Sequence, residues 1–327
     1  MMTMTKPSVA EIFAPVRDGL NAVEARMREG TPDQHEALTA AIEHLLASGG
    51  KRIRPAIALL SGGIFNADFE RLVSAAAAIE MLHTATLVHD DLVDGALLRR
   101  GIPTLNAQWS PGATVLTGDY VFARAADFAA QADSVRVMRI FARTLMVLVN
   151  GEINQMFSSR GVASREDYYR RIYSKTASVF EAASESAAVL GEARESQIAA
   201  LATYSREVGS AFQIVDDILD FTGDTNHIGK PVGSDLRQGL VTLPTLCFRD
   251  LYPDHPDLGA LLNGRMGDEA LSARVVEAIR NSSAIRVSLE EARGFVGRGI
   301  AALDNLPAGP HLENLQAIAD YVVSRDL

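Results

Sequence analysis

Two aspartate-rich motifs with the same spacing are the residues of this chain best suited to chemistry. Each reads DDxxD inside an otherwise apolar stretch; the aspartates are Asp90, Asp91 and Asp94, and then Asp216, Asp217 and Asp220. Residues four apart in a helix lie about 40° from each other around its axis, so Asp90 and Asp94 share a face and Asp91 points elsewhere. Acids in an apolar helix need a compensating partner, because burying an unpaired charge is costly.

A divalent cation is the partner that fits these acids best. Carboxylates that face one another in an apolar interior repel strongly, so a positive charge must lie among them. Mg²⁺ takes oxygen ligands, usually one or two carboxylates together with waters and substrate phosphates. The sequence therefore predicts Mg²⁺ and a phosphorylated ligand. For one such motif on a polar helix, a solvated face would be the better interpretation, but here the flanking residues are apolar.

Basic residues near the motifs could bind such a phosphorylated ligand. The segment GGKRIRP, residues 49–55, carries three cations in four residues, and Arg99 and Arg100 follow the first motif. Lys175 and Lys230 stand among small or apolar neighbours, although a lone lysine is most often a solvated side chain. Arginine binds phosphate oxygens bidentately and lysine acts as a compact charge. Two anionic groups are predicted, one bridged to carboxylates by metal and one held directly by Arg and Lys.

Long helices must position these residues. Alanine is abundant, and apolar residues recur at three- and four-residue spacing, with the first motif in a predicted helix over 68–95 and the second over 196–223. Alternating β-branched runs typical of a sheet are missing from the sequence. We expect one all-α bundle forming a single domain over 1–327. His83 lies about 20° from Asp90 on such a helix, so ligand contact and a hydrogen-bonded core position are equal alternatives.

Composition limits the partners and the location. The chain has 327 residues and a net charge of -10, which disfavours nucleic-acid binding. A single cysteine, Cys247, excludes an internal disulfide framework and a cysteine-rich metal site. No apolar signal-peptide core and no run of about 20 apolar residues occurs, so we expect a cytoplasmic protein without a transmembrane segment.

The order of these motifs resembles that of the trans-type polyprenyl diphosphate synthases. The matching segments are, in chain order, GGKRIRP, HTATLVHDDLVD with RRG and PTLN, GDY, GEINQ, KTAS, FQIVDDILD and GKPVGSDLRQGLVTLP. They span about residues 45–250. The resemblance implies an isoprenoid synthase fold, all-α around a deep central cavity, and a homodimer. It also implies head-to-tail (1′-4) condensation of isopentenyl diphosphate with an allylic diphosphate, which releases diphosphate and gives a product that partitions into membranes.

The resemblance also assigns site residues. It implies Mg²⁺, as three ions with substrate bound and with Mn²⁺ as a substitute, held by Asp90, Asp94, Asp216 and Asp220. Isopentenyl diphosphate would be bound by Lys51, Arg54, His83 and Arg100. The allylic diphosphate would be bound by Arg99, Lys175, Thr176, Gln213 and Lys230. The residues expected to be catalytic are Asp90, Asp94, Asp216, Lys175 and Arg99.

Residues just before the first motif are expected to control product length. In the resembling family they floor the product cavity, and here they are Ala85 and Thr86, with Leu82 about one turn deeper. Small residues would leave the tunnel open, so we expect an all-trans product of C30–C50, with C20 (geranylgeranyl diphosphate) as the alternative. Met146 or Met156 could close the far end.

Two other functions remain open. A terpene cyclase or a head-to-head synthase also uses aspartate-rich helices and Mg²⁺, but it would not need GGKRIRP together with Arg99 and Arg100. A non-catalytic subunit of a heteromeric synthase typically loses one acidic motif, and this chain keeps both.

Overall fold

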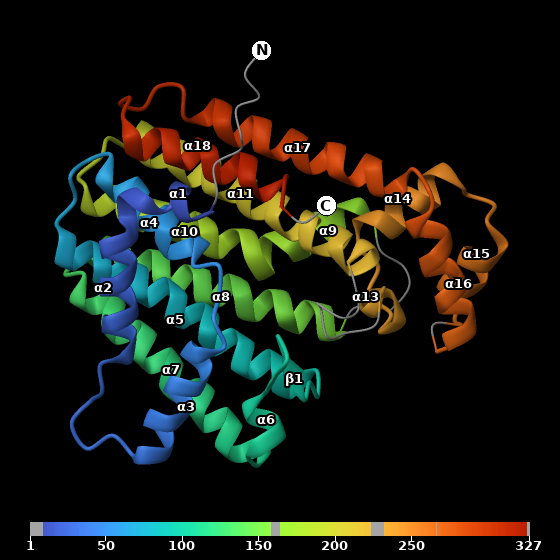
Figure 1. Cartoon of the computed structure of the whole chain (residues 1–327), viewed down its shortest axis with the longest axis horizontal. Coiled ribbons are helices and arrows are strands. Elements are labelled where there is room, and N and C mark those ends of the chain that lie inside the picture. The colour runs from blue at the N-terminus through green and yellow to red at the C-terminus, as the bar shows by residue number, and fades with distance from the viewer. Residues whose placement is uncertain (1–8, 158–163, 224–231, 266, 326–327) are drawn as a thin grey trace. The chain divides into compact units, whose positions relative to one another are not determined.

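The chain is almost entirely helical in the part that the structure describes. The computed structural model describes residues 9–157, 164–223, 232–265 and 267–325 (Figure 1). Its helices are α1 (Val9–Ile12), η1 (Ala14–Val16), α2 (Arg17–Arg28), α3 (Glu36–Ala47), α4 (Ile53–Gly63), α5 (Phe69–Val93), α6 (Leu105–Gln108), α7 (Pro111–Gln131), α8 (Val135–Phe157), α9 (Arg165–Ile172), η2 (Tyr173–Ala177), α10 (Ser178–Leu190), α11 (Glu195–Thr222), α13 (Ser234–Arg237), α14 (Leu243–Leu251), α15 (Pro256–Leu262), α16 (Glu269–Arg280), α17 (Ala284–Ala302) and α18 (Pro310–Val322). Among these residues the only strands are β1 (Leu98–Arg99) and β2 (Ile102–Pro103), which pair antiparallel. The all-α prediction is confirmed.

The described chain divides into two compact units, each built from separate segments. Unit 1 comprises Met1–Leu145, Val179–Ser205 and Ala302–Ile318. Unit 2 comprises Met146–Ser178, Arg206–Ala301 and Ala319–Leu327. The first aspartate motif therefore belongs to unit 1 and the second to unit 2. A single domain over 1–327 stays a prediction.

Helix α5 carries the first motif through the interior of unit 1. Its N-terminus is capped by Asp68, and it packs mainly against α7 and also against α4 and α2 (Figure 1). Small residues permit this close packing: a Cβ atom on Gly118 of α7 would lie 2.1 Å from Nε2 of His89. The packing of the apolar, alanine-rich face of α5 thus fixes the helix in place. This also fixes the position of the acids at its C-terminal end.

By length and composition alone, α5 could also cross a membrane. Its most apolar stretch has a mean hydropathy of 1.3, but 72% of that stretch is buried inside the fold. The core helix of a soluble protein passes the same test, so this helix is weak evidence for a membrane span.

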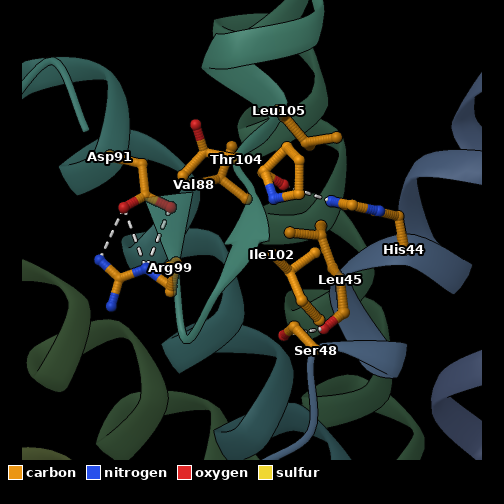
Figure 2. Close-up of a pocket in the computed structure, with 10 residues that line it drawn as sticks. His44, Leu45, Ser48, Val88, Asp91, Arg99, Ile102, Thr104 and Leu105 are labelled. Carbon is orange, nitrogen blue, oxygen red and sulfur yellow. Dashed lines mark hydrogen bonds and ion pairs between the residues drawn. The ribbon is translucent and has the colours of Figure 1, made fainter. Parts of the chain in front are cut away.

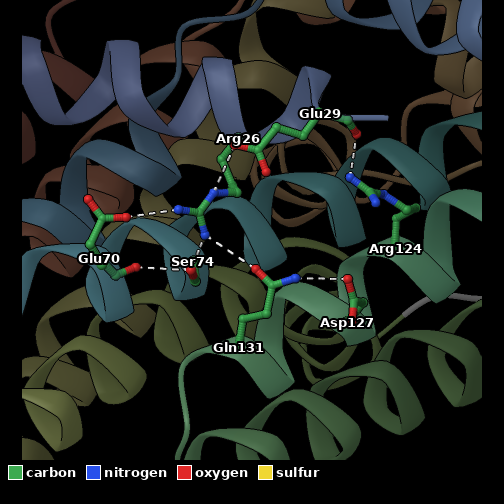
Figure 3. Close-up of polar contacts among 7 residues, drawn as sticks. All are labelled: Arg26, Glu29, Glu70, Ser74, Arg124, Asp127 and Gln131. Carbon is green, nitrogen blue, oxygen red and sulfur yellow. Dashed lines mark hydrogen bonds and ion pairs between the residues drawn. The ribbon is translucent and has the colours of Figure 1, made fainter. Parts of the chain in front are cut away.

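A polar network joins α2 to α5 and α7 in unit 1. The guanidinium of Arg26 donates hydrogen bonds to Ser74 at 2.7 Å and to Gln131 at 3.2 Å, and it pairs with Glu70 at 2.8 Å (Figure 3). One arginine of α2 therefore links α5 and α7, two helices that are distant from it in sequence. The network supports the position of α5 away from its acidic end.

In unit 2, α9 leads into an irregular turn. Ser164 and Asp167 form a reciprocal capping box that starts α9. The helix then widens into the π-helical turn η2, which carries Lys175, Thr176 and Ala177 of the KTAS segment. Such π-turns are rare and occur frequently at functional sites.

Candidate functional site

The structure separates the aspartates of the first motif by exposure. Asp91 is only 6% exposed, whereas Asp90 is half-buried and Asp94 is exposed. The carboxylate of Asp91 accepts hydrogen bonds from Nε and Nη2 of Arg99, the shortest at 2.7 Å (Figure 2). A fork of this kind is the strongest pairing between a guanidinium and a carboxylate. The buried acid is therefore neutralised locally, and the two outer acids are left on one face of α5.

The β1–β2 hairpin presents the two arginines. Its turn places Arg100 and Gly101 in the left-handed region, with φ angles of 52° and 76°. On one side, the carbonyl oxygen of Pro103 lies 2.7 Å from Nε2 of His44 (Figure 2). On the other, Arg100 donates a hydrogen bond to the carbonyl of Gly49. The turn thus brings Arg100 to the start of the GGKRIRP segment.

His83 lies among arginines of unit 1. Burial holds its pKa well below the usual 6.5, and the charges of Arg54, Arg100, Arg99 and Arg52 lower it further. The imidazole is therefore neutral at pH 7. Three of the four residues predicted to bind isopentenyl diphosphate (Arg54, His83 and Arg100) share one electropositive region, and the fourth, Lys51, is exposed just before α4.

Arg52, the remaining cation of GGKRIRP, has a different role. It forms a 2.8 Å ion pair with Glu80, which is 5% exposed within α5. Sequence reasoning overlooked this pair, although a lone glutamate inside "AAAIEML" signals a buried partner. Arg52 ties the segment to α5, while the other cations of the segment remain candidates for a ligand.

In unit 2, the middle acid of the second motif is held by neutral donors. Asp217 is 4% exposed and accepts hydrogen bonds from the hydroxyl of Tyr168 at 2.7 Å and from Nε2 of Gln213 at 2.9 Å. Burial raises the pKa of Asp217 to about 7, and the charge of Asp235 adds to this effect. Burial also raises the pKa of Tyr168 well above 10, so its hydroxyl stays protonated and keeps donating.

The same network reaches two predicted ligands of the allylic diphosphate. Oγ1 of Thr176 donates to Oε1 of Gln213 at 2.6 Å. Beside it on η2, the Lys175 ammonium forms a 2.9 Å ion pair with Glu152 of the GEINQ segment. A Cβ on Gly151 would lie 2.5 Å from Oγ of Ser174, so only glycine lets α8 approach this turn. Unit 2 therefore joins Thr176 and Gln213 by a hydrogen bond, with Lys175 next to Thr176 on η2 and paired with Glu152.

The outer acids of the second motif differ from each other. Asp216 is 40% exposed and accepts a 2.6 Å hydrogen bond from Arg325. Asp220 accepts hydrogen bonds from the backbone and hydroxyl of Ser234, at 3.1 and 2.7 Å, and from the backbone of Asp235. It thereby fixes the start of α13, a structural role that the sequence did not reveal.

A family model described as Polyprenyl synthetase matches residues 35–279. The chain belongs to the polyprenyl synthetase family. It is 37% identical over 316 residues to heptaprenyl diphosphate synthase component 2 of Geobacillus stearothermophilus, covering 96% of this chain and 98% of that protein. The nonaprenyl diphosphate synthase of Mycobacterium tuberculosis is 36% identical over 319 residues, covering 97% and 95%. The crystal structure of a polyprenyl synthase from Caulobacter crescentus CB15, complexed with calcium and isoprenyl diphosphate, matches with a TM-score of 0.88 at 35% identity, over 99% of both chains.

Family membership confirms two predictions. This polyprenyl synthetase is a prenyltransferase, and its all-α fold is the isoprenoid synthase fold. Divalent metal binding fits the family, since the Caulobacter relative is complexed with calcium. The roles of individual residues stay predictions, and Lys230 lies outside the described residues.

The donors present in this polyprenyl synthetase fit a hard cation. Asp90 lies in the last turn of α5, and Asp94, four residues later, is its C-cap. Asp216 keeps part of its carboxylate accessible, while Asp217 beside it is buried. Carboxylate oxygens are the ligands that Mg²⁺ takes. Within the described ranges, no three His, Cys, Asp or Glu side chains gather closely enough to hold a metal.

The predicted length-determining residues differ in access. Leu82 and Ala85 have no exposed surface, whereas Thr86 is partly exposed and donates its hydroxyl to the carbonyl of His83 at 2.7 Å. Thr86 lies four residues before Asp90, on the same face of α5. Of the three, Thr86 is therefore the one placed to meet a ligand on the aspartate face.

Proposed function

We propose that this protein condenses isopentenyl diphosphate head to tail with an allylic diphosphate and releases diphosphate. The observation that carries the proposal is the hairpin after α5. It places Arg99 against the motif acid Asp91 and turns Arg100 toward the GGKRIRP segment. The acids that we assign to metal and the two arginines that we assign to phosphate are thus close together in unit 1, which supports the proposal.

We assign Mg²⁺ to Asp90, Asp94 and Asp216, with a weaker share for Asp220 because its oxygens already hold α13. When bound, Mg²⁺ supplies the Lewis acidity that stabilises charge on the departing diphosphate. Three ions with substrate bound, and replacement by Mn²⁺, remain part of the proposal. Asp91 and Asp217, the middle acids, are not assigned to Mg²⁺, because they are paired with Arg99 and Tyr168.

The remaining site residues bind and orient the substrates. Arg99, Lys175, Thr176 and Gln213 hold the allylic diphosphate, with Lys230 as a further expected ligand. Lys51, Arg54 and Arg100 hold isopentenyl diphosphate. Neutral His83 carries one ring N–H, which donates a further hydrogen bond to the same substrate. The C1–O bond of the allylic substrate breaks and C1 bonds to C4 of isopentenyl diphosphate. The released diphosphate then takes a proton from C2 of the isopentenyl unit, which gives the new allylic product. Correct alignment of the two substrates is the main contribution of these side chains.

A long product is the preferred outcome. The relatives named heptaprenyl and nonaprenyl diphosphate synthase support a product of C30–C50 over the C20 alternative. Thr86→Phe should shorten the product, because a ring would project on the face that carries Asp90. Ala85→Phe is the matched test of a fully buried position and should mainly destabilise the fold through overpacking. An unchanged product length in Thr86→Phe would remove Thr86 from this role.

We propose a homodimer through the exposed face of α8. Met146, Val149, Ile153 and Phe157 are between 46% and 84% exposed and follow helical spacing on one face. Exposed apolar surfaces of this kind mark interaction sites. The exposure of Met146 and Met156 is unlike that of a tunnel-closing side chain and fits an interface better. The name "component 2" of the Geobacillus relative makes a heteromeric partner the competing outcome, and light scattering of the purified chain distinguishes the two.

The direct experiment is the consumption of labelled isopentenyl diphosphate by the purified protein with an allylic primer. We expect turnover with Mg²⁺ and none with EDTA. No consumption would favour the non-catalytic subunit, whereas cyclised or head-to-head products would favour the other alternative. A cytoplasmic location and the absence of a nucleic-acid partner stay predictions.

A further inference from the structure

Arg325 is a buried arginine whose carboxylate partner belongs to the second motif. Its side chain is 1% exposed, and it follows the end of α18. One nitrogen, Nη2, donates to Oδ1 of Asp216 at 2.6 Å and to the carbonyl oxygen of Phe212 at 2.9 Å. All three residues belong to unit 2.

The contacts of Arg325 span one turn of α11. Phe212 and Asp216 are four residues apart, so they lie on the same face of the helix. The guanidinium carbon lies 3.9 Å from the centre of the Phe212 ring, a cation–π contact. The guanidinium is thus fixed by a ring, a carbonyl and a carboxylate.

This placement makes the charge of Asp216 necessary to Arg325. A guanidinium stays protonated at every accessible pH, and burying it without a counter-charge is costly. Its Nε is buried and has no hydrogen-bond partner, so the Nη2 hydrogen bonds and the ring contact matter more to the group. Asp216 is the less buried partner, so its carboxylate could rotate if Arg325 did not hold it.

We propose that Arg325 is a positioning residue for Asp216. By holding Oδ1, it fixes the carboxylate in one orientation and leaves Oδ2 for the metal that we assign to Asp216. Metal-binding carboxylates are commonly hydrogen-bonded by an outer group that orients them. The proposal rests on the proposed function, because it assigns Asp216 to the metal.

The test compares Arg325→Met and Arg325→Lys with a matched control, Arg298→Met. Arg298 also pairs with a carboxylate, Glu207 at 2.7 Å, and stacks on a phenylalanine ring at 4.3 Å. Its partners lie outside both aspartate motifs. Calorimetry measures the binding of inorganic diphosphate at fixed Mg²⁺, and thermal melting without metal measures stability.

Arg325→Met should weaken the Mg²⁺-dependent binding of diphosphate by about 10- to 100-fold. Arg325→Lys should give an intermediate loss, because it keeps the charge and loses the planar fork. Arg298→Met should bind as the wild type does. The Mg²⁺ concentration for half-maximal turnover should rise in the same order.

Wild-type affinity in Arg325→Met, together with a lower melting temperature, would overturn the proposal and make Arg325 a structural anchor. If Arg325→Met does not fold, Arg325→Lys decides, and wild-type affinity in that variant overturns the proposal equally. If the wild type binds no diphosphate in the presence of Mg²⁺, the proposed function itself has failed.

Discussion

The first DDxxD motif neutralises its buried middle acid with a cation, whereas the second uses neutral donors. Asp91 pairs with Arg99 from the adjoining hairpin. Asp217, at the same position of the second motif, accepts hydrogen bonds from Tyr168 and Gln213, and its pKa rises to about 7. The same three-acid spacing therefore produces two different electrostatic environments.

The difference follows from what each motif must also position. In unit 1, the acid at the middle holds an arginine that we assign to the allylic diphosphate. In unit 2, the middle acid Asp217 orients Gln213, which in turn binds Thr176. The arginine of this motif, Arg325, pairs instead with Asp216. The middle acids thus hold side chains that we assign to phosphate, while the outer acids are the candidates for metal.

The largest expected effect separates outer from middle acids. Asp90→Asn should lower kcat by about 10³-fold or more, because several kcal/mol of metal-dependent stabilisation are lost. Asp91→Asn should retain more activity and chiefly raise KM for the allylic diphosphate, since Arg99 loses its partner. Steady-state kinetics on both variants measure the split. Equal losses of kcat in Asp90→Asn and Asp91→Asn would contradict the assignment of different roles to outer and middle acids.

A smaller effect should appear in the stability of the second motif. Asp216→Ala leaves the buried Arg325 without a counter-charge and should lower the free energy of unfolding by up to about 3 kcal/mol. Asp216→Asn keeps a hydrogen-bond acceptor and should lose less. Urea denaturation of the metal-free variants measures this, and a change below about 0.5 kcal/mol in Asp216→Ala would mean that the pair adds nothing to stability. For activity, Asp216→Asn is therefore the cleaner variant.

Much of this arrangement could be predicted from sequence, and the remainder could not for a physical reason. Helical periodicity and i, i+4 spacing predicted the helices and the face shared by Asp90 and Asp94. Partners that are distant in the chain have no local pattern: Arg325 reaches Asp216 across 109 residues, and Tyr168 reaches Asp217 across 49. Exposure also separated Thr86 from Ala85, which spacing alone had treated as equivalent.

The smallest expected effect is the pH dependence that His83 of unit 1 adds to stability. The folded pKa of His83 lies well below 6.5, so the unfolded chain binds its proton more readily and stability falls as pH drops below about 6.5. This one group contributes at most about 1.4 kcal/mol per pH unit. His83→Gln should remove that part of the slope between pH 6.5 and 5 in urea denaturation. The same slope in His83→Gln as in the wild type would contradict the neutral assignment.

The most direct test of the central claim is the length of the product made by the purified wild-type chain. The protein is incubated with Mg²⁺, an allylic primer and radiolabelled isopentenyl diphosphate, and the products are separated by chromatography. We predict Mg²⁺-dependent all-trans chains of C30–C50. A product that stops at C15 or C20, or no incorporation of label, would contradict it.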